Sequence, residues 1–132
     1  MQTPWGYADR VIALARGVTD VSTPSHGGII VTKRWGEANL SEAARDNGMK
    51  FMDGWAFEED CKWVIVYNEH PELFPAINEN GNREAAESAL SWEVEYCHAI
   101  GLPVSAVIIN RLLQFTRGAR RTKLLDILAT VT

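Results

Sequence analysis

The sequence predicts an α+β fold in which a small antiparallel sheet from the N-terminal third packs with about four to five helices. Three observations lead to this prediction. Short runs rich in β-branched residues alternate with turn signals up to residue 33. Apolar residues follow helical spacing after residue 82, and Leu102-Pro103 interrupts this helical part. A chain of 132 residues has the length of one domain, so we expect a single domain spanning residues 1–132.

Three strands are expected near the N-terminus. Residues 9–14 and 18–23 flank Ala15-Arg16-Gly17, which has the composition of a turn. Residues 28–33 form a third run that is rich in β-branched side chains. Because the connections between these runs are short, they favour an antiparallel meander.

A short helix is expected next, over residues 40–46. Asn39 and Glu42 are three residues apart, as in a capping box, and Asn47-Gly48 supplies a C-terminal stop. Asp53-Gly54 is then interpreted as a turn.

The segment that begins at Phe57 is ambiguous. Residues 63–67 have strand propensity, whereas the apolar residues from Phe57 to Asn68 follow helical spacing. The acidic run 58–60 would suit the first turn of a helix, because carboxylates are favourable at the positive end of the helix dipole. We favour a helix that begins at Phe57 and ends before Pro71.

The second half predicts three helices. Asn82 caps a helix over residues 83–100, residues 104–115 are strongly apolar, and residues 119–131 are amphipathic with basic edges. Because residues 104–115 are apolar around more than one face, we expect part of this helix to lie under the following helix or in a homodimer interface.

The composition is that of a globular chain, and it disfavours several classes of protein. The longest apolar runs, such as residues 63–67, are far shorter than the roughly 18 residues of a membrane span. The first residues lack the pattern of a secretory signal, so we expect a cytoplasmic protein without membrane insertion. Cys61 and Cys97 are then expected to be free thiols. No nucleotide-binding, kinase or metalloprotease motif is present, and no cofactor is predicted.

Charge is divided unevenly along the chain. Eleven acidic side chains lie between Asp53 and Glu95 against two basic ones, while the tail carries Arg117, Arg120 and Arg121. Solvated helix faces would explain this pattern. Complementary contact surfaces would also explain it, and the three arginines are then candidate binding residues. The tail cations have no interleaved aromatic residues and the middle is acidic, which disfavours direct nucleic-acid binding.

Residues 22–28, Ser-Thr-Pro-Ser-His-Gly-Gly, form the first candidate site. His26 offers an imidazole that responds near neutral pH, as a general base requires, and the Ser25 hydroxyl lies beside it in sequence. Gly27 and Gly28 allow the backbone to approach a ligand or another segment closely, and their amides can bind an anionic group. The alternative is a turn histidine bonded to the backbone, with glycines that only bend the chain.

Residues 57–63, which include three consecutive carboxylates, form the second candidate site. Glu58 or Asp60 is a candidate partner that orients His26 for acid–base chemistry. Alternatively, Glu58 forms an ordinary helix salt bridge with Lys62, four residues later.

Cys61 follows these carboxylates, which favour the protonated thiol over a reactive thiolate. Packing as a small hydrophobe is therefore its expected role, with a nucleophile, a metal ligand and another binding role as alternatives. No short metal-binding spacing occurs in the chain, so a metal would need ligands from distant segments, and none is predicted.

Four motifs follow one another over residues 3–75. They are Thr3-Pro4-Trp5-Gly6, then Val21-Ser22-Thr23-Pro24-Ser25-His26-Gly27-Gly28, then Glu58-Glu59-Asp60-Cys61-x-Trp63, and finally Pro71-Glu72-Leu73-Phe74. In this order they resemble an uncharacterised domain family encoded by bacteriophages and plasmids. The resemblance implies a mobile-element accessory protein with its site at His26 and residues 58–61. It implies no particular reaction, and the half after Pro75 is not matched.

Small size, the absence of a cofactor motif and segregated charge favour protein binding over catalysis. We expect a phage-type accessory protein that inhibits a host protein or ribonucleoprotein complex of the defence system, such as a CRISPR nuclease. One alternative is a hydrolase or transferase in which His26 is the base and Glu58 or Asp60 orients it. Another is a binder of nucleotides or signalling molecules at Gly27 and Gly28.

Overall fold

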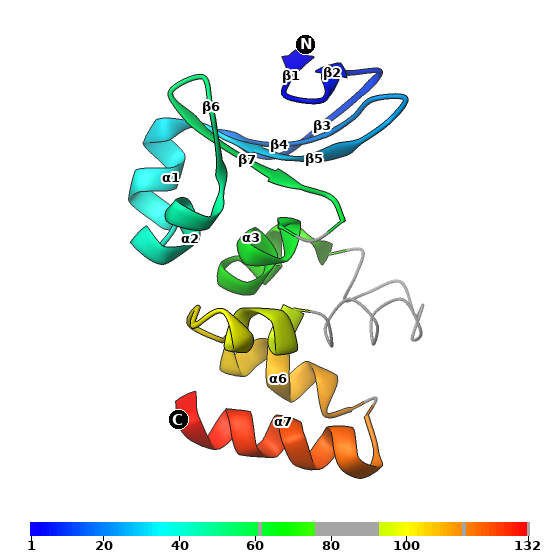
Figure 1. The fold of residues 1–132 in the computed structure, drawn as a ribbon, viewed down its shortest axis with the longest axis vertical. Helices are drawn as coiled ribbons and strands as arrows, with labels where there is room; N and C mark the ends of the chain where they lie inside the picture. The colour runs from blue at the N-terminus through cyan, green and yellow to red at the C-terminus, as the bar shows by residue number, and fades with distance from the viewer. Residues whose placement is uncertain (61, 76–92, 115, 132) are drawn as a thin grey trace. The chain divides into compact units, whose positions relative to one another are not determined.

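A computed structural model describes residues 1–60, 62–75, 93–114 and 116–131 and shows the expected α+β fold (Figure 1). The chain divides into two compact units, an N-terminal unit (Met1–Val66) and a C-terminal unit (Tyr67–Thr132). The single domain expected over residues 1–132 stays a prediction. Among the described residues, no helix is long and apolar enough to cross a bilayer.

The N-terminal unit contains two antiparallel sheets. The smaller pairs β1 (Gln2–Thr3) with β2 (Gly6–Tyr7). The larger has the strand order β3-β4-β5-β7-β6. Its strands are β3 (Arg10–Ala15), β4 (Val18–Ser22), β5 (Gly27–Val31), β6 (Met49–Phe51) and β7 (Gly54–Glu58). The meander of three strands is confirmed to within two residues at each end. The strands β1, β2, β6 and β7 were not predicted.

The core of this unit lies on both faces of the larger sheet. One face carries a cluster comprising Ala8, Val21, Ile30 and Ala56, with Trp5 and Phe51 packed against it. Since side chains alternate along a strand, Phe57 points to the opposite face, where it is fully buried. Every residue of β5 is buried, which accounts for its uninterrupted apolar sequence.

Helix α1 (Lys33–Asn39) follows β5 directly. The Thr32 hydroxyl caps it by accepting a hydrogen bond from the Trp35 amide at 3.3 Å. The helix packs against β7, and a Cβ at Gly36 would collide with the ring of Trp55. Helix α1 was not predicted, because the β-branched run before it favours a strand through Lys33 and because Gly36 is a poor helix former.

Helix α2 (Glu42–Asn47) confirms the expected short helix but corrects its cap. The Ser41 hydroxyl accepts a hydrogen bond from the Ala44 amide at 3.0 Å, so Ser41 is the N-cap. Asn39 instead ends α1 and donates to the Trp35 carbonyl at 3.0 Å. The capping box predicted between Asn39 and Glu42 was wrong, because Asn39 belongs to the preceding helix.

The helix expected from Phe57 begins only at α3 (Trp63–Glu69). Phe57 lies in β7, opposite Ile29 of β5, and burial between sheet and helices overrides its helical spacing. The acidic run 58–60 therefore covers the end of a strand and the turn after it, not the first turn of a helix. For the same reason Glu58 and Lys62 do not form the helical pair that was considered.

The C-terminal unit is helical. The 3₁₀ turn η1 (Pro71–Leu73) follows α3, residues 93–99 are helical, and α6 (Ala106–Leu112) and α7 (Gly118–Val131) complete the described elements. These elements agree with the three helices expected in the second half. The proposed cap at Asn82 and the first part of its helix lie outside the described residues.

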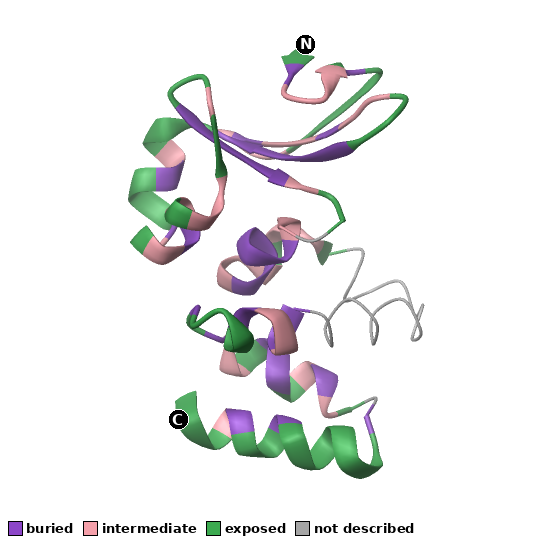
Figure 2. Cartoon of the chain, in the orientation of Figure 1, coloured by how far each residue is buried: buried purple, intermediate pink, exposed green. Residues whose placement is uncertain are grey.

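The apolar surface of α6 is largely covered within the chain, as Figure 2 shows by residue burial. Ile108, Ile109 and Leu112 are fully buried, and α6 packs against α7. Val107 is 54% exposed. Packing under the following helix is thus confirmed and accounts for most of the apolar surface, while a homodimer stays a prediction.

Candidate functional site

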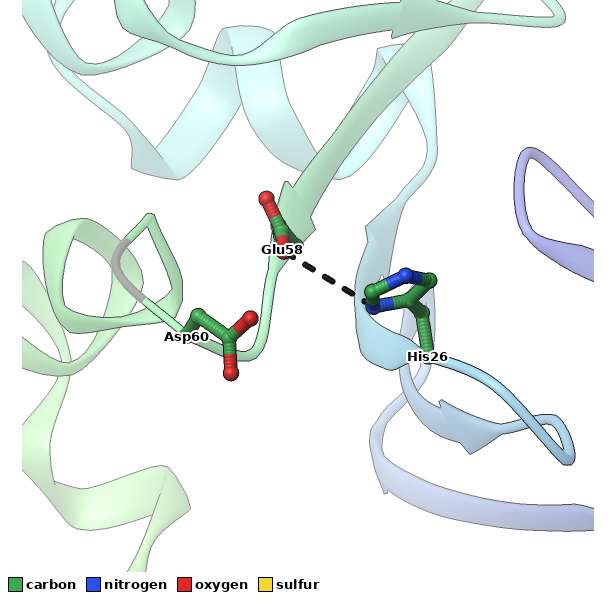
Figure 3. Close-up of side chains that lie close together, drawn as sticks. All are labelled: His26, Glu58 and Asp60. Carbon is green, nitrogen blue, oxygen red and sulfur yellow. Dashed lines mark ion pairs between the residues drawn. The ribbon is translucent and has the colours of Figure 1, made fainter.

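Strand register brings the two predicted site segments together. Gly28 of β5 lies opposite Glu58 of β7, and the Glu59 amide donates to the Gly27 carbonyl at 2.9 Å, so the register continues past both strand ends. Two residues beyond the pair of Gly28 and Glu58, the same register sets His26 opposite Asp60. Since residues two apart share a face of a strand, His26, Glu58 and Asp60 lie on one face (Figure 3).

The turn that carries His26 is held by Thr23. The Thr23 hydroxyl accepts a hydrogen bond from the His26 amide at 3.1 Å and donates to the His26 carbonyl at 2.7 Å. The Thr23 amide also donates to that carbonyl, at 2.7 Å. These bonds fix the backbone of His26 and leave its ring at the surface, with Pro24 and Ser25 at the exposed tip.

The three side chains converge on exposed surface. Nδ1 of His26 lies 4.0 Å from Oε1 of Glu58, and the two side chains are 52% and 34% exposed. One donor atom from each of His26, Glu58 and Asp60 lies within 4.8 Å of the others. The two segments thus meet as expected, and the distance of 4.0 Å between His26 and Glu58 exceeds that of a direct hydrogen bond. Their catalytic role stays a prediction.

The neighbouring Glu59 faces away from this group. Because side chains alternate along a strand, Glu59 lies on the opposite face, where its charge affects the pKa of Asp20 in β4. Burial raises the pKa of Asp20 above its usual value, Arg10 opposes this, and the Glu59 carboxylate adds to the increase. Glu59 is therefore a natural comparison residue for the cluster of His26, Glu58 and Asp60.

Gly27 and Gly28 are explained by contacts within the protein. A Cβ at Gly27 would meet the Val21 carbonyl oxygen and the Glu59 carboxylate, and one at Gly28 would meet the Phe57 carbonyl and the Trp5 ring. Both residues are buried in β5 between β4 and β7. Close approach to another segment, one of the two roles considered, therefore accounts for both glycines without a bound anion.

The predicted tail arginines differ in their surroundings. Nε of Arg120 lies 4.0 Å from Oε1 of Glu95, and Arg121 donates to the Leu113 carbonyl at 2.6 Å. Arg117 is exposed, with no ion pair to any residue in the described part of the chain. Two of the three arginines therefore have structural partners within the C-terminal unit. The remaining predicted binding residue, Cys61, lies outside the described residues.

Sequence reasoning missed a buried group of titratable side chains in the C-terminal unit. Tyr67, Glu93 and Cys97 are each 0% exposed, and neither carboxylate oxygen of Glu93 has a hydrogen-bond partner among the described residues. Burial raises the pKa of Glu93 well above its usual 4.5. The available signal was spacing, because Glu93 precedes Cys97 by four residues and so shares its helix face.

The two neighbours of Glu93 respond to the same environment. Burial, and then the nearby Glu93 carboxylate, raise the pKa of Tyr67 to about 12, while Arg111 opposes the increase by its charge and a hydrogen bond. Burial, with the carboxylates of Glu93 and Glu69, also raises the pKa of the Cys97 thiol to about 12. Both groups are neutral at physiological pH, and Cys97 is a free, buried cysteine.

Fold and cluster together define a small α+β protein with an exposed His-Glu-Asp group where two central strands of its sheet end. The chain belongs to the family described as Domain of unknown function (DUF7007), which matches residues 1–106. The match covers the whole N-terminal unit and extends beyond Pro75, where the sequence motifs stopped. No curated protein and no solved structure shows significant similarity to the chain.

Proposed function

We propose that this chain is a small mobile-element accessory protein that acts by binding a protein in the host cytoplasm. The partner is a component of a host defence complex, such as a CRISPR nuclease. The resemblance of the sequence motifs supports the mobile-element setting. An exposed apolar edge strand supports binding as the mode of action.

This edge strand is β3. It pairs with β4 on one side and forms the edge of the described sheet on the other. Val11 and Ile12 are 50% and 39% exposed, although neighbouring residues of a strand point to opposite faces. Tyr7, just before the strand, is 71% exposed. Open backbone groups flanked by apolar side chains suit the addition of a strand from another protein.

The shape of β3 limits what it can accept. The register with β4 shifts between Ala13 and Ala15, so the regular edge covers Arg10 to Ala13. Within these residues only Arg10 is charged, and no lysine or proline blocks strand addition. We therefore propose that the partner contributes a short, extended and largely apolar segment.

Acid–base catalysis is the second candidate function. It is favoured by one observation, the 4.0 Å approach of Nδ1 of His26 to Oε1 of Glu58. If a side-chain rotation brings this carboxylate within hydrogen-bond reach, it can orient an imidazole that removes a proton from a substrate. In this case the activity would depend on His26 and not on β3.

A plasmid-interference assay tests both functions. Bacteria with a defined CRISPR nuclease are transformed with a targeted plasmid while they express the wild type, Ile12→Glu, Met52→Glu or His26→Ala. The wild type should protect the targeted plasmid from the nuclease. We expect Ile12→Glu to abolish this protection and to weaken binding to the purified nuclease complex at least about tenfold. Met52 is 85% exposed in the turn between β6 and β7, so Met52→Glu is the matched control and should behave as the wild type.

The outcomes separate the alternatives. Loss of protection in His26→Ala, with Ile12→Glu silent and both variants folded by circular dichroism, would reject binding through β3 and favour a function at His26. Absence of protection and of complex formation by the wild type against representative nuclease types would reject the defence-related role.

A further inference from the structure

We propose that His26, Glu58 and Asp60 form a binding site for a divalent transition-metal ion such as Zn²⁺. The three side chains come from the residue before β5, the end of β7 and the turn after it, and their polar ends face one another (Figure 3). One donor atom from each lies within 4.8 Å of the other two. This inference goes beyond protein binding by β3 and does not depend on it.

The charges of the cluster favour a cation between the three groups. The cluster contains two carboxylates and one imidazole. No lysine or arginine in the described ranges forms an ion pair with Glu58 or Asp60. The single contact within the group, between His26 and Glu58, is 4.0 Å long, so it is not a hydrogen bond. A bound dication would neutralise both carboxylates and give each donor atom a direct partner.

The donor distances fit a small closure around such an ion. Zinc binds imidazole nitrogen and carboxylate oxygen at about 2.0–2.2 Å, which puts the donor atoms of a tetrahedral site roughly 3.4 Å apart. The donor atoms lie 4.0 Å apart for His26 and Glu58 and within 4.8 Å for the whole group, so each has to move by only about 1 Å, which side-chain rotation can supply. The β5–β7 register fixes the backbone of Glu58, and the bonds of Thr23 fix that of His26, so we assign the closure to side-chain rotation.

The donor types identify the class of metal. Imidazole nitrogen suits zinc, nickel, copper and iron, whereas magnesium and calcium are bound mainly by oxygen. The set of one histidine and two carboxylates therefore favours a transition metal over Mg²⁺. Three protein ligands leave at least one coordination position open, which is typical of catalytic or exchangeable sites.

Such an ion changes what the surface can do. A water molecule in the open position would have its pKa lowered towards 7, which provides a nucleophile at neutral pH. A donor group of a bound partner can take the same position. Either use requires an exposed ion, and His26 and Asp60 are both exposed.

Metal titration of the full chain tests this proposal. After treatment with a chelator, Zn²⁺ and Mg²⁺ are titrated by calorimetry into the wild type and into His26→Ala, Asp60→Asn and Glu59→Gln. We expect one Zn²⁺ per chain, weaker Mg²⁺ binding, and a loss of affinity of at least about tenfold in the first two variants. Glu59→Gln removes the same charge from the opposite face and should bind Zn²⁺ as the wild type does.

Three further measurements test which side chains are the ligands. Cys61→Ser and His70→Ala should retain wild-type affinity, and the absorption spectrum of the Co²⁺-substituted protein should lack a thiolate charge-transfer band. Zn²⁺ affinity should also fall at acidic pH, because imidazole binds metals only in its neutral form. No Zn²⁺ binding, equal affinity for Mg²⁺, an unchanged affinity in His26→Ala, or a loss confined to Cys61→Ser would each overturn the proposal. Circular dichroism of every variant confirms that these results do not reflect unfolding.

Discussion

Substitution of the buried Glu93 by glutamine should change the pH dependence of stability. The Glu93 side chain is 0% exposed, and its oxygens have no hydrogen-bond partner in the described part of the chain. Burial therefore favours the neutral acid and raises the pKa of Glu93 well above 4.5. Glutamine has nearly the same shape and one amide in place of the carboxyl, but it does not titrate.

The magnitude follows from proton linkage. Between the pKa of the unfolded chain, near 4.5, and the higher folded pKa, the native protein holds one proton more than the unfolded chain. The free energy of unfolding therefore falls as pH rises, by up to about 1.4 kcal/mol per pH unit. Below both pKa values this stabilisation is fully present. Glu93→Gln should match the wild type at pH 4 and become progressively more stable than it above pH 5.

Urea unfolding followed by circular dichroism at several pH values between 4 and 8 measures this difference. Glu95→Gln is the matched control, because Glu95 lies two residues along the same helix but is 38% exposed and paired with Arg120 and Lys123. Exposed pairs contribute about 0–1 kcal/mol, so this variant should follow the pH dependence of the wild type. Parallel curves for the wild type and Glu93→Gln would refute the reasoning.

Four further predictions concern alkaline stability, packing, hydrogen bonding and surface charge. Because Tyr67 and Cys97 ionise only near pH 12 in the folded chain, stability should fall further above about pH 9, and Cys97→Ala should reduce this slope in urea unfolding measurements. Gly28→Ala would press a Cβ against the backbone of β7 and should cost about 1–3 kcal/mol or prevent folding, as thermal unfolding would show. The buried Asn68 side chain donates to the Pro103 carbonyl and accepts from the Ser105 amide at 2.9 Å, so Asn68→Ala should cost about 2–4 kcal/mol, and a change below about 0.5 kcal/mol would contradict this. Arg120→Ala should change stability by less than about 1 kcal/mol, because its pair with Glu95 is exposed.

Local patterns in the sequence were sufficient for much of the fold. The β-branched run that became β5 and the strands that precede it were predicted to within two residues at their ends. The apolar and basic spacing of α7 was likewise enough to place that helix. These signals are reliable because a strand buried on both faces and an amphipathic helix each require a characteristic local spacing of apolar residues.

Phe57 and Asn39 show where local patterns fail. Phe57 fits helical spacing, but pairing of β7 with β5 puts it in the centre of a sheet, and that partner is 28 residues away in sequence. Asn39 fits a capping box, but it already ends the helix before. In both cases a tertiary contact or a neighbouring element competes with the local preference and is energetically stronger.

The candidate site illustrates the same division. The sequence indicated that His26, Glu58 and Asp60 were chemically suitable, and it predicted that residues 58–60 lie in the first turn of a helix. In the structure Glu58 ends β7 and Asp60 lies in the turn just after it, and both carboxylates lie close to the His26 ring. The chemical types of the candidate site residues could therefore be identified from the sequence alone. Their convergence was decided by strand register, because only long-range hydrogen bonding sets residue 26 opposite residue 60.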